Sequence, residues 1–224
     1  MMVHELRSPL SVIKGSADLL LREEKNLKED QKYTLLSQIK VSSSDLLEVV
    51  NDILDVSKIE SGRLDIKKAM GDFNKVLYDE ADYYMALARE KEINVETILD
   101  DKIPHFEFDE DRMKHVMNNL LSNALKFTDD GGHVAIESKL ADEYHVEVCI
   151  SDTGPGVPDD MKGKLFNKFV QMENRKNKKE KGTGLGLVIT KGIIEAHGGS
   201  IWIEDNEPMG AKFMFTVPIA NPEE

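Results

Sequence analysis

The stretch NNLLSNALKFT, residues 118–128 of this 224-residue chain, combines asparagines and a lysine with apolar residues at helical spacing. Asn119 and Asn123 are four residues apart and Lys126 follows three residues later, so on a helix the three side chains share one face. Amide oxygens beside an ammonium group suit a hydrated Mg²⁺ ion and a polyphosphate. Taken alone the pattern is weak, because asparagines at this spacing also form ordinary internal hydrogen bonds.

Two glycine-containing stretches follow. SDTGPGVP places Asp152 directly after the apolar run VEVCI and before Gly154 and Gly156. A carboxylate at a strand end can accept a hydrogen bond from an exocyclic amine such as that of adenine, and glycine backbone lets a flat ligand approach. KGTGLGL, residues 181–187, opens a predicted helix, where backbone N–H groups can receive phosphate. Each stretch alone also matches an ordinary turn.

Composition limits the class of protein and its partners. Forty-two acidic against 29 basic residues give a net charge of −13, which disfavours nucleic acid and anionic membranes as partners. Apolar runs are short, so neither a bilayer-spanning helix nor a signal peptide is predicted, and we expect a soluble, cytoplasmic polypeptide. The single cysteine, Cys149, excludes an internal disulfide and is expected to be a small core residue.

The N-terminal part predicts a helical hairpin. Helical spacing of apolar residues runs from residue 3 to 20, and a heptad pattern runs from residue 31 to about 61. A hairpin alone cannot bury so wide an apolar stripe, which favours pairing with a second copy into a dimeric four-helix bundle. The alternative is that the stripe packs on the rest of the same chain. The sequence SGRLDI then breaks the helical period, so we divide the chain into 1–64 and 65–224.

The second part mixes helical and strand patterns. Helical spacing covers 73–93, 110–128 and 187–196, and Asp109 or Glu110 is expected to begin the middle helix. Alternation typical of strands covers 93–99, 133–140, 145–152, 200–205 and 212–218. Helices interleaved with hairpins predict an α+β fold, an α/β sandwich with helices on one face of a mixed sheet.

The order of the motifs is more specific than any one of them. GTGLGL has no preceding strand and no GK[ST], which excludes a Walker loop and a dinucleotide fingerprint. Instead the sequence resembles the histidine kinase family, within the wider ATPase superfamily that includes gyrase and Hsp90. NNLLSNALKFT resembles the N box, DTGPG the G1 box, LFNKFVQ the F box, GTGLGL the G2 box, GAKFMF a last glycine box and HELRSPL the H box. This resemblance covers essentially the whole chain.

The resemblance implies an ATP site with bound Mg²⁺. Asn123 would coordinate Mg²⁺, Asn119 would support the phosphates and Lys126 would neutralise them. Phe127 would flank the adenine, although a core aromatic is the alternative role for it, and Asp152 would accept from the adenine amine. The remaining nucleotide-binding positions would admit the base or form the phosphate-side hinge of a lid: Gly154, Gly156, Gly182, Thr183, Gly184, Leu185 and Gly186.

The segment between Phe169 and Gly182 carries five cationic side chains. It is either a solvated loop or, as its flanking glycines suggest, a lid over ATP with Arg175 or a lysine near the γ-phosphate.

The H-box resemblance at HELRSPL assigns the catalytic residues. A neutral imidazole near pH 7 has a free lone pair, so His4 is expected to accept the phosphoryl group. Glu5 would accept the other ring proton as a general base. Ser8, four residues after His4, is the candidate for a phosphatase role, because the family often has threonine or asparagine at that position.

The expected function is therefore an autophosphorylating protein-histidine kinase of two-component signalling. The family passes the phosphoryl group to an aspartate in the receiver domain of a separate response regulator, and we expect a homodimer with an upstream sensor region that this chain lacks. Two alternatives are an ATPase clamp of the same superfamily without kinase activity, and a catalytically silent dimeric interaction module. The clamp would have no use for His4 and Glu5 on a hairpin, and the silent module is expected to lack Asn123 or Asp152.

Overall fold

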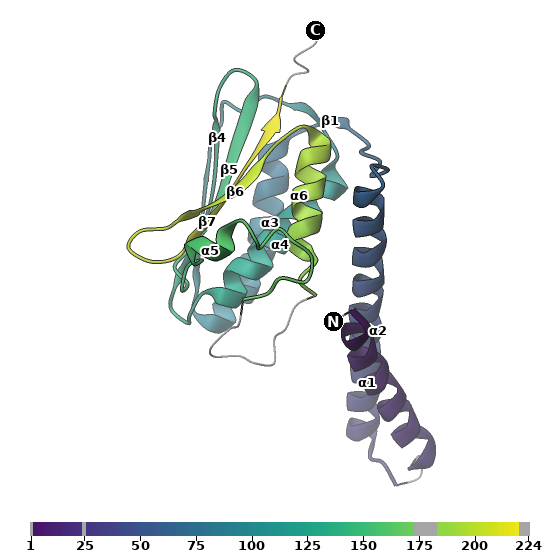
Figure 1. The fold of residues 1–224 in the computed structure, drawn as a ribbon. Helices are drawn as coiled ribbons and strands as arrows, with labels where there is room; N and C mark the ends of the chain where they lie inside the picture. Colours follow the sequence, from purple (N-terminus) through teal and green to yellow (C-terminus); the bar gives the residue numbers. More distant parts are fainter. Residues whose placement is uncertain (1, 24–25, 173–182, 220–224) are drawn as a thin grey trace.

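The computed structural model describes residues 2–23, 26–172 and 183–219, and only the backbone of residues 2–5. The first two helices, α1 (Met2–Arg22) and α2 (Glu29–Glu60), form the predicted antiparallel hairpin (Figure 1). α2 begins with Glu29 and Asp30 and has Lys58 in its last turn, charges that complement the helix dipole.

The apolar stripe of the hairpin is only partly covered. Along its length several large apolar side chains are exposed, among them Leu10, Leu19, Leu36, Val41, Leu47, Val50 and Leu54. At the C-terminal end of α2, in contrast, Val56 is buried in the core of the second part, and Ile53 and Ile59 pack against that core. The end of the stripe therefore packs on the same chain, while coverage of the remainder by a second copy stays a prediction.

The second part is an α+β fold, as predicted. Its elements are β1 (Ala69–Gly71), α3 (Phe73–Ala88), the 3₁₀ turn η1 (Arg89–Lys91), β2 (Asn94–Leu99), β3 (Phe106–Phe108), α4 (Glu110–Phe127), β4 (His133–Leu140), β5 (His145–Asp152), α5 (Asp159–Lys162), α6 (Gly186–His197), β6 (Ile201–Asp205) and β7 (Ala211–Pro218). Five strands form a sheet in the order β2-β4-β5-β7-β6, in which the β2–β4 pair is parallel and the others antiparallel. Helices α3, α4 and α6 lie on one face of this mixed sheet (Figure 1).

Three short elements were not predicted. β1 and β3 have three residues each and pair with each other, with Ala69 opposite Phe108, and α5 is a single turn. Segments this short do not complete a detectable period, so only the tertiary structure identifies them.

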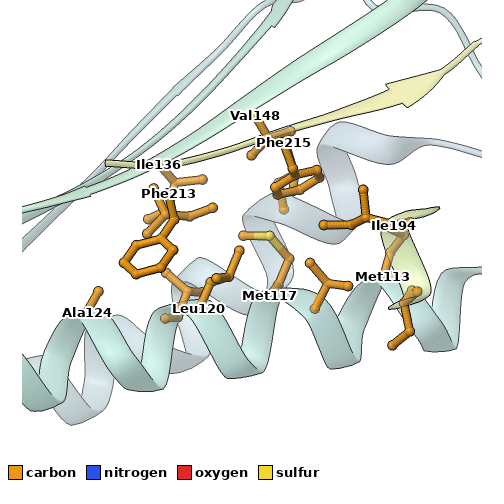
Figure 2. Close-up of a cluster of buried hydrophobic side chains, with 14 of the residues drawn as sticks. Met113, Met117, Leu120, Ala124, Ile136, Val148, Ile194, Phe213 and Phe215 are labelled. Atoms are coloured by element: carbon orange, nitrogen blue, oxygen red, sulfur yellow. The ribbon is translucent and has the colours of Figure 1, made fainter. Parts of the chain in front are cut away.

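The core lies between α4 and the sheet. Figure 2 shows Met113, Met117, Leu120 and Ala124 of α4 facing the strands, where Phe215 is fully buried. Their spacing of four, three and four residues makes one continuous apolar stripe on the helix. Burying this stripe leaves the polar face of α4 partly exposed.

Asp109 caps α4 and links several elements. Its carboxylate accepts from the backbone N–H of Arg112 at 3.1 Å and of Lys67 at 2.8 Å. Its own N–H donates to His197 Nε2 at 3.1 Å, and the other ring nitrogen, Nδ1, lies 2.8 Å from the carbonyl oxygen of Ile193. Burial lowers the pKa of His197, which suits a neutral ring with Nδ1 as donor. The structure thus confirms Asp109 as the helix start.

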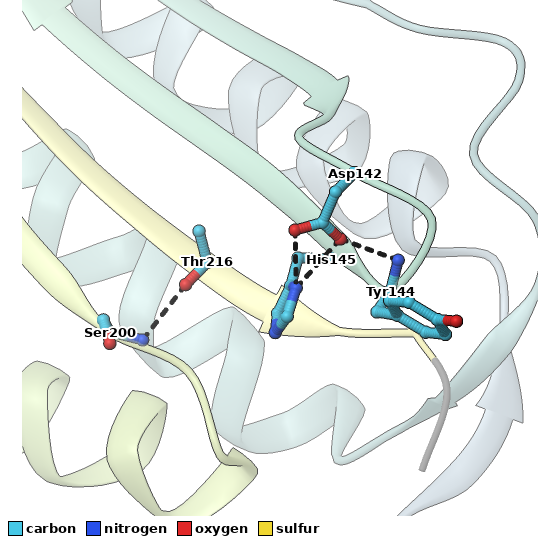
Figure 3. A network of polar contacts seen from close by, with 5 residues as sticks. All are labelled: Asp142, Tyr144, His145, Ser200 and Thr216. Carbon is cyan, nitrogen blue, oxygen red and sulfur yellow. Dashed lines mark hydrogen bonds and ion pairs between the residues drawn. The ribbon is translucent and has the colours of Figure 1, made fainter. Parts of the chain in front are cut away.

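The β4–β5 turn closes the sheet at the end of β5 opposite to Asp152. Asp142 accepts from the backbone N–H of Tyr144 at 2.7 Å and contacts His145 Nδ1 at 3.0 Å (Figure 3). These contacts, the first of them above all, lower the pKa of the Asp142 carboxyl. Within β5, Cys149 is buried as predicted, and burial raises the pKa of its thiol to about 11.

No helix within the described ranges is both long enough and apolar enough to cross a membrane.

Candidate functional site

Asn119, Asn123 and Lys126 lie on one partly exposed face of α4, as their spacing predicted. Asn123 Nδ2 donates to Asn119 Oδ1 at 3.5 Å, a long hydrogen bond. Asn119 Nδ2 donates to Thr190 Oγ1 of α6 at 3.0 Å. Asn119 therefore ties α4 to α6, whereas Asn123 makes the weaker contact within its own helix.

The start of α6 packs closely against the same face. A Cβ atom on Gly186 would overlap the side-chain amide of Asn119, so a larger residue there would displace that side chain. Leu185 is buried, and its backbone N–H donates to Thr183 Oγ1 at 3.2 Å. Gly184 has a positive φ of 68°, and its carbonyl oxygen accepts from the backbone N–H of Phe169 at 2.9 Å. The fold thus brings the glycine-rich turn onto the asparagine face.

Asp152 ends β5 beside the C-terminal end of α4. Its carboxylate is buried and accepts from the backbone N–H of Gly154 at 2.8 Å. Burial raises the pKa of Asp152, and hydrogen bonds from the backbone N–H groups of Gly154 and Ala211 oppose the rise. A Cβ atom on Gly154 would lie 2.7 Å from the carbonyl oxygen of Phe127, so the two motifs are in direct contact.

Phe127 and Lys126 lie at this junction. Phe127 is partly exposed, unlike the buried phenylalanines of the core, which argues against the alternative role of a core aromatic. Lys126 Nζ lies 5.7 Å from the centre of the Phe127 ring. A flat ligand beside Asp152 would therefore meet an aromatic ring and a cation next to it.

The β6–β7 turn supports Asp152, and the sequence interpretation did not assign its residues to the site. Gly210 has a φ of 126°, and a Cβ atom there would overlap the carbonyl oxygen of Asp152. Asn206 Nδ2 donates to that same oxygen at 2.8 Å. Gly156, with a φ of 73°, packs against the backbone of Gly210. The sequence signal for this support was Gly210 itself, the first residue of GAKFMF, to which no role in the site was assigned from the sequence.

The substitution Gly210→Ala is expected to lower the free energy of unfolding by about 2–4 kcal/mol, because it adds steric overlap to an unfavourable φ. Urea denaturation followed by circular dichroism measures the change. Gly163→Ala is the control, since nothing lies within 4 Å of a Cβ atom at that position. Equal midpoints for Gly210→Ala and the wild type would show that the turn does not hold the strand end.

Several predicted site residues are not placed by the structure. His4 and Glu5 lie on the backbone of α1, but their side chains are outside the described part of the chain. Gly182 and Arg175 lie outside the described residues, as does all of the predicted lid except residues 170–172. Ser8 is exposed on α1.

Two family models match the chain. Residues 108–221 match the family described as histidine kinase-, DNA gyrase B-, and HSP90-like ATPase. Residues 1–62 match the His Kinase A phospho-acceptor domain. The two matches cover the two parts of the chain that carry the candidate residues.

Individual relatives agree with the models. The chain is 34% identical over 223 residues to hybrid signal transduction histidine kinase D of Dictyostelium discoideum, covering 96% of this chain and 14% of that protein. ShkA, solved in complex with AMPPNP, superposes with a TM-score of 0.76 at 30% identity, over 97% of this chain and 44% of ShkA. The histidine kinase ThkA, solved in complex with the response regulator TrrA, gives a TM-score of 0.69 at 26% identity, over 99% of this chain and 61% of that one.

The chain spans about one seventh of the length of the Dictyostelium kinase and less than half of the length of ShkA. Its helical hairpin and mixed-sheet domain correspond to the phospho-acceptor and ATPase models in the same order. This chain belongs to the histidine kinase family and is the catalytic core of a sensor histidine kinase.

Proposed function

We propose that this chain transfers the γ-phosphoryl group of ATP to His4 and then to an aspartate of a separate response regulator. One observation carries the proposal: a phospho-acceptor domain and an ATPase domain occur in one chain, and the ATPase domain brings its three polar motifs together. Asn119 touches the start of α6, and Gly154 touches the end of α4. We further propose that the boundary between the two domains lies between residues 64 and 65.

The nucleotide would bind along the face formed by α4, the end of β5 and the start of α6. Asp152 would accept from the adenine amine, Phe127 would flank the ring, and Gly154 and Gly156 would admit it. Lys126 and Asn119 would face the phosphates, with Thr183 contributing its hydroxyl and Gly184 and Gly186 their backbone N–H groups at the start of α6. Leu185, whose own N–H donates to Thr183 Oγ1, would hold the turn in shape. Gly182 would complete this turn.

Asn123 would hold Mg²⁺ with its amide oxygen, since its amide nitrogen donates to Asn119. Within the described residues, no group of three or more His, Cys, Asp or Glu side chains could hold a metal ion. A single amide oxygen, that of Asn123, still fits Mg²⁺, because this ion is commonly held by few protein ligands together with phosphate oxygens and water. Bound there, Mg²⁺ would offset the negative charge on the phosphate oxygens.

The reaction would form a bond between an imidazole nitrogen of His4 and the γ-phosphorus. The bond from that phosphorus to the bridging oxygen breaks, and ADP leaves with the electron pair. As the new bond forms, Glu5 would accept the proton from the other ring nitrogen, so that the phosphorylated ring is left neutral. Lys126 and the lid cations would stabilise the charge on the departing ADP oxygens.

A receiver domain and a second copy of the chain are the proposed partners. The complex of ThkA with TrrA supports a response regulator as the phosphoryl acceptor, and the exposed apolar side chains of the hairpin support a dimer. Ser8, exposed on α1 four residues after His4, is the proposed phosphatase residue. A cytoplasmic location belongs to the proposal, because ATP is available there and Cys149 is unpaired.

Incubation with γ-labelled ATP and Mg²⁺ tests the function. We expect label on the wild-type chain that is lost in acid and retained in base, because a phosphorus–nitrogen bond to imidazole is hydrolysed when the ring is protonated. A clamp ATPase would release labelled phosphate without becoming labelled itself. An inert interaction module would give neither product, and either result would contradict the proposal.

A further inference from the structure

The C-terminal half of α2 is docked on the ATPase domain, beside α6 (Figure 1). Val56 is buried in the domain core, and Gly192 of α6 packs so closely on Ile59 that a Cβ atom there would overlap it. Glu60 forms an ion pair with Lys168. The hairpin and the nucleotide domain therefore share a continuous contact.

Two carboxylates on the same side of α2 complete this contact. Asp55 accepts from Arg112 Nη1 of α4 at 2.8 Å. Asp52, one turn earlier, accepts from Thr183 Oγ1 at 3.3 Å. Asp52 is only 7% exposed, and burial raises its pKa although nearby His115 opposes the rise. The cleft beside them is lined by Glu48, Asp52 and Asp55 and also by Lys58, Arg112 and His115. Lys58 and Arg112 both pair with Asp55, whereas Asp52 has the hydroxyl of Thr183 as its hydrogen-bond donor.

Thr183 belongs to the turn that is proposed to receive phosphate. Its hydroxyl oxygen accepts from the backbone N–H of Leu185, and its single proton is donated to Asp52. A hydroxyl has one proton to donate, so Thr183 cannot donate to Asp52 and to a phosphate oxygen at the same time. A buried carboxylate next to the turn also repels an approaching phosphate.

The contact lies near the level of His4 along the hairpin. Ser16 Oγ donates to Gln38 Oε1 at 3.2 Å, which pairs residue 16 of α1 with residue 38 of α2. His4 is twelve residues before Ser16, and Val50 is twelve residues after Gln38, so the antiparallel register places the backbone of His4 near Val50. Asp52 is thus within one helical turn of the level at which the phosphoryl group is to be received.

We propose that Asp52 sets the nucleotide affinity of the chain, because hairpin docking and the phosphates of ATP compete for the hydroxyl of Thr183. The inference rests on the proposed function and adds a residue of the hairpin to the determinants of ATP binding. By linkage, the contact weakens nucleotide binding by the same factor by which nucleotide weakens the contact.

Calorimetric titration of the full chain with Mg²⁺ and AMPPNP tests the proposal. Asp52→Asn keeps the shape of the side chain and an acceptor oxygen for Thr183 but removes the charge, so it is expected to tighten AMPPNP binding by about fivefold, the difference between a charge-assisted and a neutral hydrogen bond. Asp45→Asn, the same change at an exposed position of α2, is expected to leave the affinity unchanged.

A double-mutant cycle assigns the effect to Thr183. In a Thr183→Val background, which lacks the hydroxyl, Asp52→Asn is expected to change the affinity by less than about twofold. An unchanged affinity for Asp52→Asn, or a fivefold gain that persists with Thr183→Val, would overturn the inference. Absence of AMPPNP binding by the wild type and by every variant would instead contradict the proposed function.

Discussion

His4→Gln is expected to reduce phosphate labelling of the chain to background, a loss of at least about a thousandfold. The substitution removes the nucleophile, and the glutamine amide nitrogen has no available lone pair with which to attack phosphorus. Labelling with γ-labelled ATP, followed by electrophoresis and exposure to acid and base, measures the loss. Glutamine is also a good helix former, so α1 is expected to remain intact.

The control for this prediction is His105→Gln. His105 is exposed in the loop before β3, where its Nε2 lies 3.8 Å from Asp72, far along the chain from the residues assigned to the reaction. We expect this variant to be labelled like the wild type. Acid-labile label that persists on His4→Gln would show that another histidine accepts the phosphoryl group. If label is lost, an AMPPNP titration of the same sample shows whether the ATP site is preserved.

Asp152→Asn is expected to weaken AMPPNP binding by about 10- to 100-fold, because the adenine amine loses a charged acceptor worth roughly 1.5–3 kcal/mol. The asparagine oxygen can still accept from Gly154, but the side-chain NH₂ group, a hydrogen-bond donor, would then face the adenine amine, which is also a donor. Burial raises the pKa of Asp152, so the ionised carboxylate lowers the stability of the folded domain at neutral pH. Removing the charge is therefore not expected to unfold the domain.

Calorimetry gives the affinity for this variant, and thermal denaturation checks that it is folded. GTP sharpens the test, because guanine presents a carbonyl at the position of the adenine amine, and a carboxylate repels it. The preference for ATP over GTP should therefore fall in Asp152→Asn. Asp142→Asn, at the opposite end of the sheet, is the matched control. An unchanged preference for ATP would show that Asp152 does not recognise the base.

Much of the fold was predictable from local patterns. The predicted helix 110–128 and strand 145–152 agree with α4 and β5 to within one residue, because the apolar residues of each follow one clear period. The spacing of Asn119 and Asn123 likewise placed them on one helix face. The short elements β1, β3 and α5 escaped prediction because three or four residues do not establish a period.

The candidate site was predictable in its members but not in its contacts. Asp152 was identified from its position at a strand end, yet the glycine that packs on its carbonyl oxygen, Gly210, comes from a turn 58 residues later. The role of Asn119 at the phosphates stays a prediction, and its hydrogen bond to Thr190 of α6 could not be predicted from its segment. Such partners depend on how helices and strands pack, which a pattern within one segment does not encode.

The sequence by itself determined the class of this protein, because periodicity and the order of six motifs reflect local backbone geometry and the residue types that the chemistry needs. Only the tertiary structure decided that Asp52 of the hairpin meets Thr183 of the nucleotide domain, 131 residues away. Burial of Val56 and Ile59 against the domain seats α2 and thereby sets which of its carboxylates reach the phosphate turn. The free energy of that packing is shared among many distant residues, so no single stretch of the chain records it.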